Sequence, residues 1–247
     1  MNKHYVFGAN IYIPYEVVGE SDNTYIIDEY INKGGNGVVY KCIDQDSGEE
    51  FAIKFLLSSR NSDAQRFKQE IEVLKSVNHD HIVKYMDSGT VHTILDKKEK
   101  KIGHSLLFVV IELASCDLRQ YLEARKFRIG SEEYLGQIRG LSSALSVIHE
   151  TTVHRDIKPG NILVCGERWV LTDFGLCARP DNALNLTREN QPVGPRYWMS
   201  PEANNRVLGV SSEICRASDV FQLASVFWLI INGFHPTGVL TRTDWVG

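Results

Sequence analysis

Two short stretches, His154–Asn161 (HRDIKPGN) and Asp173–Gly175 (DFG), decide the fold of this chain. Between them lie two apolar runs, 162–164 and 169–171, separated by a turn at Gly166, which predict a pair of short strands. That arrangement would bring four polar groups to one edge, namely Asp156, Lys158, Asn161 and Asp173. Two carboxylates, an amide and an ammonium group are what metal-assisted phosphoryl transfer needs. They neutralise the γ-phosphoryl charge while a hydroxyl is aimed at it.

The overall composition is that of a globular protein. With 247 residues, of which 43% are hydrophobic, the chain can form one large domain or two lobes. The net charge of -4 argues against binding nucleic acid or an anionic membrane by bulk electrostatics. Residues 1–15 lack a signal-peptide pattern, and the apolar run Phe221–Ile231 is shorter than the roughly 20 residues of a membrane span. We therefore expect a cytoplasmic protein that binds neither nucleic acid nor membrane, in an oligomeric state that the sequence leaves open.

The five cysteines give no sign of a disulfide framework or a zinc site. They are scattered, odd in number and never in a Cys-x-x-Cys spacing. For Cys177, just after the DFG stretch, we expect a buried, inert thiol; the alternative is a thiol reachable from the active cleft.

The first half of the chain contains short β-type runs. Runs at 25–31, 38–43 and 51–56 predict an antiparallel meander. The preceding segment, 1–21, has no clear periodicity, so it is either an arm packed on the domain or a disordered tail. The turn 32–37 (NKGGNG) is rich in glycine, which lets backbone N–H groups approach phosphate oxygens. The alternative for that turn is an ordinary tight hairpin.

A lysine and a glutamate in this half are predicted to meet. In the third run, residues 51, 53 and 55 share one face, and Lys54 lies on the other. The following helix has a predicted apolar stripe of Phe67, Ile71, Leu74 and Val77. Glu70 lies beside that stripe, and the alternative, Glu72, falls away from it. An inward glutamate needs a partner, and Lys54 is the available cation. The alternative for Lys54 is an edge lysine that prevents aggregation.

The rest of the chain is a mixture of strands and helices. Runs at 81–87 and 105–113 predict strands, joined through a charged stretch, 96–101, that we expect to be a solvated hairpin. The connector that starts at Glu112 is where an adenine ring could form strand-like hydrogen bonds. A helix is predicted over 131–149, and the apolar run 221–231 predicts a helix buried on most sides.

Together these motifs resemble the eukaryotic-type (Hanks-type) serine/threonine protein kinase family, over roughly residue 25 to the C-terminus. The resemblance implies an α+β, two-lobe fold, with a five-stranded antiparallel sheet and one helix in the N-lobe and a mainly helical C-lobe. The C-lobe is short, ending soon after the buried helix, as expected of a truncated chain or a compact variant. The implied domains are an N-terminal extension (1–21), the N-lobe (22–111), a hinge (112–116) and the C-lobe (117–247).

The resemblance also implies a role for individual residues. Asp156 would orient the substrate hydroxyl, Lys158 would steady the transferred phosphoryl group, and Lys54, paired with Glu70, would bind phosphates. Asn161 and Asp173 would hold Mg²⁺. Asp219 would brace the catalytic loop, and His154 and Phe174 would join the internal hydrophobic stack. The implied ATP-binding set comprises Gly34, Gly35, Gly37, Val39, Ala52, Lys54, Ile111, Glu112, Ala114 and Leu163. Ordinary core packing is the alternative explanation for Val39, Ala52 and Leu163.

Several positions depart from the family pattern. Asn32 replaces the first loop glycine, and asparagine tolerates positive φ. Pro195 replaces a threonine, which puts peptide selection in doubt. Arg155 is of the type that receives an activation-loop phosphate, and Thr187 is the only hydroxyl between Gly175 and Tyr197. The loop is therefore either regulated at Thr187 or constitutively ordered, with Glu189 near Arg155. Glu202, in the Ser-Pro-Glu segment, has no identifiable arginine partner.

The leading hypothesis is an ATP- and Mg²⁺-dependent serine/threonine protein kinase, a phosphotransferase acting on protein substrates and on itself. Lys158, two residues after Asp156, favours serine/threonine over tyrosine specificity. The second hypothesis is a pseudokinase or ATP-binding scaffold. The third is a small-molecule kinase of the antibiotic-phosphotransferase type, which usually has glycine in place of Arg155 and lacks a Ser-Pro-Glu segment.

Overall fold

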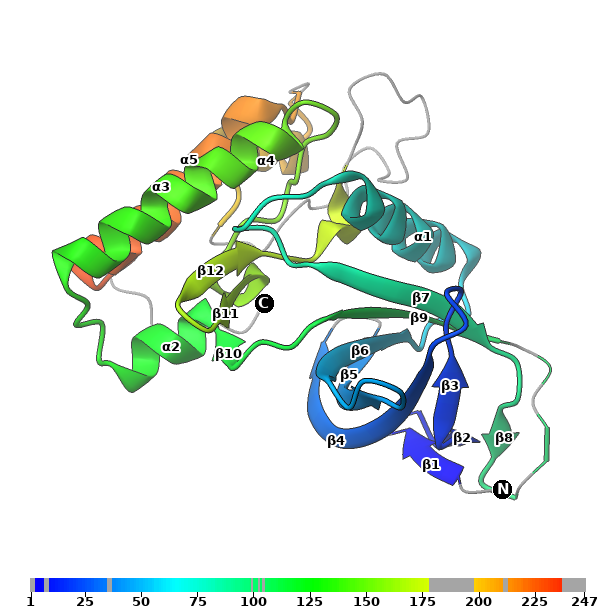
Figure 1. Ribbon diagram of the computed structural model, residues 1–247. Helices are drawn as coiled ribbons and strands as arrows, with labels where there is room; N and C mark the ends of the chain where they lie inside the picture. Colours follow the sequence, from blue (N-terminus) through cyan, green and yellow to red (C-terminus); the bar gives the residue numbers. More distant parts are fainter. Residues whose placement is uncertain are drawn as a thin grey trace. The chain divides into compact units, whose positions relative to one another are not determined.

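The computed structural model describes residues 3–6, 9–34, 37–98, 100–101, 103, 105–177, 198–210 and 213–236. The chain divides into two compact units (Figure 1). Unit 1 comprises residues 1–75 and 84–113, and unit 2 comprises residues 76–83 and 114–247. The finer domain boundaries implied by the sequence stay a prediction.

Unit 1 is built on a six-stranded antiparallel sheet in the order β3-β4-β5-β6-β9-β7. Its strands are β3 (Glu16–Val18), β4 (Thr24–Gly34), β5 (Gly37–Asp44), β6 (Glu50–Leu56), β7 (Tyr85–Val91) and β9 (Leu106–Glu112). The predicted meander is confirmed as β4, β5 and β6. The predicted count of five strands is wrong by one, because β3 adds a strand beside β4. The strand predicted over 81–87 begins only at Tyr85, since Val83 instead donates its N–H to Leu171 in unit 2.

The N-terminal segment is an arm that packs on unit 1. It forms β1 (Lys3–Val6) and β2 (Ile11–Pro14), which make a second sheet in the order β1-β2-β8 with β8 (Leu95–Asp96). Val6, Ile13 and Val17 are buried in the same core cluster as the main sheet. Burial of these apolar side chains explains why the described part of this segment packs on the core rather than forming a tail. The charged stretch after Asp96 turns back as predicted, with Asp96 donating its N–H to the carbonyl of Lys100.

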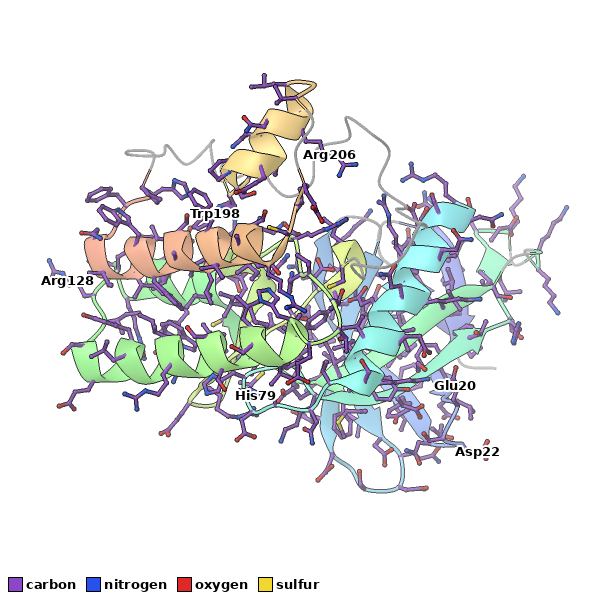
Figure 2. The ribbon with its side chains drawn as sticks, turned by 90° about the horizontal axis from the view of Figure 1, so that it is seen from above. Glu20, Asp22, His79, Arg128, Trp198 and Arg206 are labelled. Atoms are coloured by element: carbon purple, nitrogen blue, oxygen red, sulfur yellow. The ribbon has the colours of Figure 1, made fainter. Side chains whose placement is uncertain are left out.

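A buried carboxylate fastens this arm to β7. Asp87 has no exposed surface, and its oxygens accept hydrogen bonds from Ser21, Tyr25 and the N–H of Ser88. A Cβ added to Gly19 would lie 2.0 Å from the Asp87 carboxylate, so only glycine fits there without a shift. Figure 2 labels Glu20 in the same turn; its carboxylate lies 2.9 Å from Lys75 at the end of α1.

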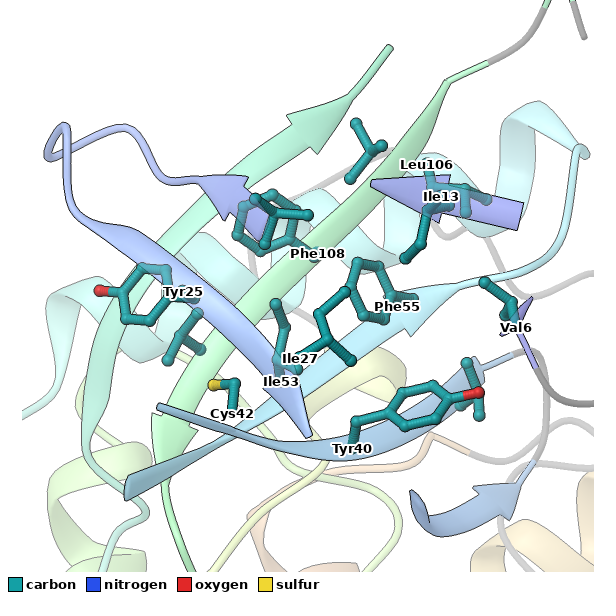
Figure 3. Close-up of a cluster of buried hydrophobic side chains, with 14 of the residues drawn as sticks. Val6, Ile13, Tyr25, Ile27, Tyr40, Cys42, Ile53, Phe55, Leu106 and Phe108 are labelled. Carbon is teal, nitrogen blue, oxygen red and sulfur yellow. The ribbon is translucent and has the colours of Figure 1, made fainter. Parts of the chain in front are cut away.

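The core of unit 1 lies on one face of its sheet (Figure 3). Ile53 and Phe55 are completely buried there together with Phe108, and Phe51 packs against them, as the alternation in β6 predicted. Helix α1 (Asn61–Ser76) also belongs to this unit, and it buries Phe67, Ile71 and Leu74 of the predicted stripe together with Glu70. The predicted fourth member, Val77, follows the end of the helix and is half-buried. Sheet and helix thus bring Lys54 and Glu70 within reach of one another.

Unit 2 is mainly helical. Its helices are α2 (Leu118–Ala124), α3 (Ser131–Ile148), α4 (Pro201–Val207) and α5 (Arg216–Asn232), with short 3-10 turns η1 (Pro159–Asn161) and η2 (Phe174–Leu176). A small antiparallel sheet contains β10 (Cys116–Asp117), β11 (Ile162–Cys165) and β12 (Arg168–Leu171). The predicted helix over 131–149 and the strand pair around Gly166 are confirmed. No helix within the described ranges has the length and apolar character to cross a bilayer.

Helix α5 differs from its prediction in which side chains it buries. Val220, Trp228 and Ile231 are about half exposed, while Asp219 and Gln222 are buried. The prediction of a helix buried on most sides is therefore wrong for one face. The physical reason is that polar side chains, Asp219 and Gln222, occupy the buried face, where they accept hydrogen bonds from backbone N–H groups of unit 2. Several apolar residues of the run therefore lie on the exposed face.

Candidate active site

Unit 1 contains the predicted ion pair. Lys54, on β6, places its Nζ 2.7 Å from Oε1 of Glu70 on α1. The Glu70 side chain is 6% exposed and that of Lys54 is 24% exposed. A carboxylate so well buried is costly without a partner, so this contact fixes both the lysine and the helix face that carries Glu70.

Four residues of the implied ATP-binding set share one face of the unit 1 sheet. Directly opposite residues in antiparallel strands project to the same side, and the registered pairs are Val39 with Lys54 and Ala52 with Ile111. Ala52 and Lys54 are two positions apart on β6, so both pairs share this face. Ile53 lies on the other face, in the core. The sheet therefore presents an apolar surface around one lysine.

The glycine turn lies at the end of β4 and β5. Gly34 and Gly37 are opposite one another, and a Cβ on Gly37 would come within 3.0 Å of the Phe55 carbonyl oxygen. Glycine at 37 therefore avoids a tight contact, because a side chain there would force that carbonyl to move by a few tenths of an ångström. Gly35 lies outside the described residues.

The connector residues are placed separately in the two units. In unit 1, Glu112 donates its N–H to the Lys84 carbonyl, and its Oε1 accepts the Lys84 N–H. In unit 2, Ala114 is half-buried and Leu163 lies on β11, while the N–H of Ser115 binds the Val164 carbonyl.

Unit 2 brings three predicted catalytic residues together. Oδ2 of Asp156 accepts hydrogen bonds from Lys158 Nζ at 3.1 Å and from Asn161 Nδ2 at 2.7 Å. The same Nδ2 also donates to the Asp156 carbonyl at 2.8 Å. The other carboxylate oxygen, Oδ1, is buried and has no hydrogen-bond partner among the described residues. A buried, unpartnered acceptor is costly, so this oxygen calls for a functional explanation.

Electrostatics reinforce this picture. Burial raises the pKa of Asp156, the Lys158 cation opposes that rise, and the charge of Asp173 adds to it. Asp173 therefore lies close enough to interact with Asp156. It has φ 64, in the left-handed region, and it directly precedes η2. A carboxylate whose charge raises the pKa of its neighbour favours the binding of a cation nearby.

The donor set fits Mg²⁺ held jointly with a nucleotide. Among the described residues no group of three or more His, Cys, Asp or Glu side chains could hold a metal ion. Mg²⁺ typically uses one or two carboxylates together with substrate phosphates rather than an all-protein cage. The carboxylate of Asp173 and the amide oxygen of Asn161 are donors of this kind, and the Thr172 N–H binds the Asn161 carbonyl, which ties the two segments together.

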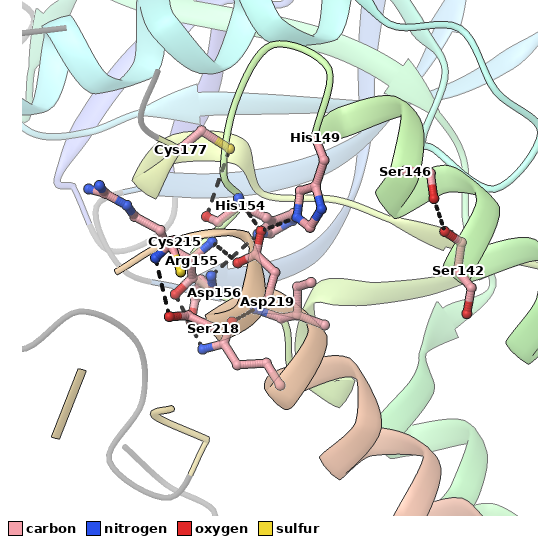
Figure 4. Close-up of polar contacts among 12 residues, drawn as sticks. Ser142, Ser146, His149, His154, Arg155, Asp156, Cys177, Cys215, Ser218 and Asp219 are labelled. Atoms are coloured by element: carbon pink, nitrogen blue, oxygen red, sulfur yellow. Dashed lines mark hydrogen bonds and ion pairs between the residues drawn. The ribbon is translucent and has the colours of Figure 1, made fainter. Parts of the chain in front are cut away.

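Helix α5 holds the backbone of the catalytic loop (Figure 4). Asp219, with no exposed surface, accepts the N–H of His154 at Oδ2 and that of Arg155 at Oδ1, both at 2.7 Å. His149 Nε2 lies 2.9 Å from the same Oδ2. The predicted contact of Asp219 with the catalytic loop is present. The rings of His154 and Phe174 also meet as predicted, with centroids 5.0 Å apart.

Sequence reasoning missed two of these supporting residues. His149 follows α3 and was not assigned a role, and Gln222 lies one helical turn after Asp219. The only signal for Gln222 was its spacing of three from Asp219, which places both on one helix face. The hydrogen bonds of Gln222 form only with the folded loop.

The protein-family model of the protein kinase domain matches residues 9–244 of this chain. The chain belongs to this family. Its α+β, two-lobe fold is that of a protein kinase, as predicted, with the additional strand described above.

Known protein kinases are similar over most of this kinase domain. MAP3K epsilon protein kinase 1 of Arabidopsis thaliana is 34% identical over 207 residues, covering 82% of this chain and 14% of that protein. Serine/threonine-protein kinase PknA of Corynebacterium glutamicum is 30% identical over 217 residues, covering 86% of this chain and 44% of that protein. PknA of Mycobacterium tuberculosis is 29% identical over 217 residues, covering 86% of this chain and 47% of that protein. The chain thus spans less than half the length of these relatives.

The arginine of the kinase catalytic loop is strained and buried. Arg155 has φ 71, and its Nε is buried with no hydrogen-bond partner among the described residues. Burial lowers the pKa of Arg155, and the charge of Arg206 on α4 lowers it further (Figure 2). The residues predicted to act on Arg155, Thr187 and Glu189, lie outside the described residues, as does Pro195.

Two further expectations are decided in unit 2. The sequence offers no arginine partner for Glu202, and in the structure Ser218 donates a hydrogen bond to its Oε2 at 3.2 Å. The pKa of Glu202 is lowered by its own backbone N–H and by the hydroxyls of Ser200 and Ser218. Hydroxyl groups thus take the place of the expected arginine. Cys177 is buried, as expected, with Sγ 3.8 Å from the His154 carbonyl oxygen.

Proposed function

We propose that this protein is an ATP-dependent serine/threonine protein kinase. It transfers the γ-phosphoryl group of Mg-ATP to serine and threonine hydroxyls of protein substrates, including its own. The observation that carries the proposal is the buried carboxylate of Asp156, with Oδ2 held by Lys158 and Asn161 and Oδ1 left without a partner among the described residues. The names of the two PknA relatives, which are serine/threonine-protein kinases, support it.

The proposed roles follow from these contacts. Oδ1 of Asp156 accepts the proton of the substrate hydroxyl, because it is the buried acceptor that still lacks a donor. Lys158 holds Asp156 in place and adds a positive charge where phosphoryl charge develops. In unit 1, Lys54 binds nucleotide phosphates, and Glu70 keeps its ammonium group in place.

Asn161 and Asp173 would hold Mg²⁺, and the ATP-binding set named above would hold the nucleotide. The bound metal would supply charge neutralisation on the phosphate oxygens. For this chain, the task of Asn161 is double, because its Nδ2 also fixes the carboxylate of Asp156. Removal of Asn161 should therefore disturb both metal affinity and the orientation of Asp156.

The alternative of a pseudokinase or ATP-binding scaffold has no observation in its favour, since Lys54, Glu70, Asp156, Asn161 and Asp173 are all present. A cytoplasmic location, protein rather than nucleic-acid partners and regulation at Thr187 through Arg155 stay predictions. The free state of the five cysteines is compatible with that location.

The decisive experiment is transfer of labelled phosphate from Mg-ATP to the protein itself and to a mixed protein substrate. Transfer should be lost in Lys54→Met, Asp156→Ala and Asp173→Ala. Lys41→Met is the matched control for Lys54, because Lys41 lies on β5 and pairs with Asp28 and Glu50 near the surface. Incorporation that persists in all three variants would indicate a contaminating kinase. Binding of Mg-ATP without transfer by the wild-type protein would replace the proposal with the pseudokinase.

A further inference from the structure

Gln222 is a buried amide whose contacts are all with backbone groups. It lies on α5, is 2% exposed, and forms three hydrogen bonds. Its Oε1 accepts the N–H of Ile157 at 3.0 Å. Its Nε2 donates to the carbonyl oxygens of Arg155 at 3.3 Å and Trp198 at 3.1 Å. Both N–H groups and the carbonyl of the amide are therefore used.

These bonds lie on both sides of the proposed catalytic residue. Arg155 precedes Asp156 and Ile157 follows it, so one side chain holds the two neighbours of Asp156 in the chain. Asp219 lies one helical turn earlier and holds the N–H groups of His154 and Arg155. The first turns of α5 thus bind a nearly continuous stretch of loop backbone.

The loop needs this support because its backbone is strained. Arg155 adopts a φ of 71°, a left-handed conformation that is unfavourable for a residue with a Cβ. Such a conformation persists only where the surroundings over-determine it. At Arg155 the N–H is bound by Asp219 and the carbonyl by Gln222, so both of its backbone polar groups are held by α5.

The third bond connects the loop to a different segment. Trp198 is buried and stands two residues before Ser200, the N-cap of α4. Because the same Nε2 binds the carbonyls of Arg155 and Trp198, a displacement of Trp198 changes the position of the amide that also holds the catalytic loop.

We propose that Gln222 is a positioning residue for phosphoryl transfer. It fixes the peptide groups on both sides of Asp156 and couples them to the segment that begins at Trp198. The inference rests on the proposed kinase activity for its kinetic consequence, but its structural part can be measured without any activity.

The primary test is Gln222→Met, which keeps the length of the side chain and removes all three bonds. Ser225→Ala is the matched control, because Ser225 is also buried on α5 but bonds only to the Phe221 carbonyl of its own helix. Amide hydrogen exchange at Ile157 should become about tenfold faster in Gln222→Met, as expected for loss of one net hydrogen bond, and stay unchanged in Ser225→Ala. In phosphate transfer, kcat should fall about 10- to 100-fold with an unchanged KM for ATP.

A second variant separates the role of the acceptor, Oε1, from that of the donor, Nε2. It also serves as the test if Gln222→Met does not fold. Gln222→Glu keeps an acceptor for the Ile157 N–H and loses the donors to Arg155 and Trp198. It should retain exchange protection at Ile157 and still lose kcat, because carboxylate oxygens would face two carbonyls. Unchanged Ile157 exchange in Gln222→Met would overturn the positioning role, as would equal changes in kcat and in KM for ATP.

The failure of the two proposals can be told apart. If the wild-type protein transfers no phosphate, the proposed function fails, while Ile157 exchange still decides whether Gln222 holds the loop. If the wild-type protein is active and Gln222→Met matches it in kcat, the positioning role fails and the kinase proposal stands.

Discussion

The two units hold their key charged groups by different means. In unit 1, Lys54 is held through its side chain, which pairs with Glu70 on α1. In unit 2, Asp156 has side-chain bonds of this kind from Lys158 and Asn161, but its backbone is held as well, because α5 binds the peptide groups on either side of it. A side-chain pair is broken when a single helix moves, whereas a bound backbone is released only when several hydrogen bonds break together.

The difference indicates where each unit is adjustable. The Lys54–Glu70 pair in unit 1 would break if α1 shifted, whereas the hydrogen bonds from α5 in unit 2 hold Asp156 in one geometry. Variants in unit 1 should therefore change how phosphate is bound, and variants in unit 2 should change how fast it is transferred. The following predictions test this contrast, beginning with the largest expected effect.

We expect Asp156→Asn to lower phosphate transfer by about 10³-fold, because the substrate hydroxyl loses its proton acceptor. The melting temperature should not fall. Burial raises the pKa of Asp156, so the ionised carboxylate destabilises the fold at neutral pH, and the neutral amide removes that cost. Labelled-phosphate transfer and thermal melts measure the two effects. A variant that retained a tenth of wild-type kcat would contradict the assigned role.

We expect Glu70→Gln to reduce kcat/KM for ATP by about 10- to 100-fold, because Lys54 loses the charge that orients it. Glu72→Gln is the matched control, since Glu72 lies on the same helix and is exposed. The loss should appear in KM for ATP as well as in kcat. If only kcat changed, the contrast between the two units would be lost.

We expect Asp87→Ala to lower the free energy of unfolding by about 2–4 kcal/mol, because the buried donors of Tyr25 and Ser88 and the donors of the exposed Ser21 would lose their acceptor. Denaturant titration gives the value, with the exposed Asp46→Ala as control. Transfer activity of the folded fraction should change less than threefold. A change in kcat comparable to that of Glu70→Gln would show that the arm also controls α1.

The smallest effect concerns pH. Because burial raises the pKa of Asp156, kinase activity should fall on acidification at a higher pH than an exposed aspartate would give. The Lys158 cation lowers that pKa, so Lys158→Met should move the acidic fall to still higher pH, after each profile is scaled to its own plateau. Profiles of kcat/KM measure the shift. A movement to lower pH would contradict the assignment of the acidic limb to Asp156.

Local patterns were enough to predict most of the framework. Alternation in β6 predicted that Lys54 and Ile53 lie on opposite faces of the sheet, and the apolar stripe of α1 predicted that Glu70 faces inward. The spacing within HRDIKPGN brought Asp156, Lys158 and Asn161 together. These predictions succeed because side-chain direction along a strand, helix or short loop follows from position alone.

The missed features all depend on contacts between distant residues. β1, β2 and β8 are short, and β8 pairs with a strand more than 80 residues earlier in the chain. The partner of Glu202 is Ser218, on another helix, and Gln222 acts on backbone groups that no sequence pattern identifies. The exposed apolar face of α5 was also missed, because hydrophobicity alone does not show which face is buried.

The hydrogen bonds between Asp87 and the N-terminal arm determine where this protein can be shortened. A chain cut at Tyr25, where the family resemblance begins, would lose Ser21 and the strand beside β4. It would expose a sheet edge and apolar surface that Val6, Ile13 and Val17 now cover. Fragments for crystallisation or for library screening should therefore keep the residues from β1 onward, even though they lie outside the catalytic motifs.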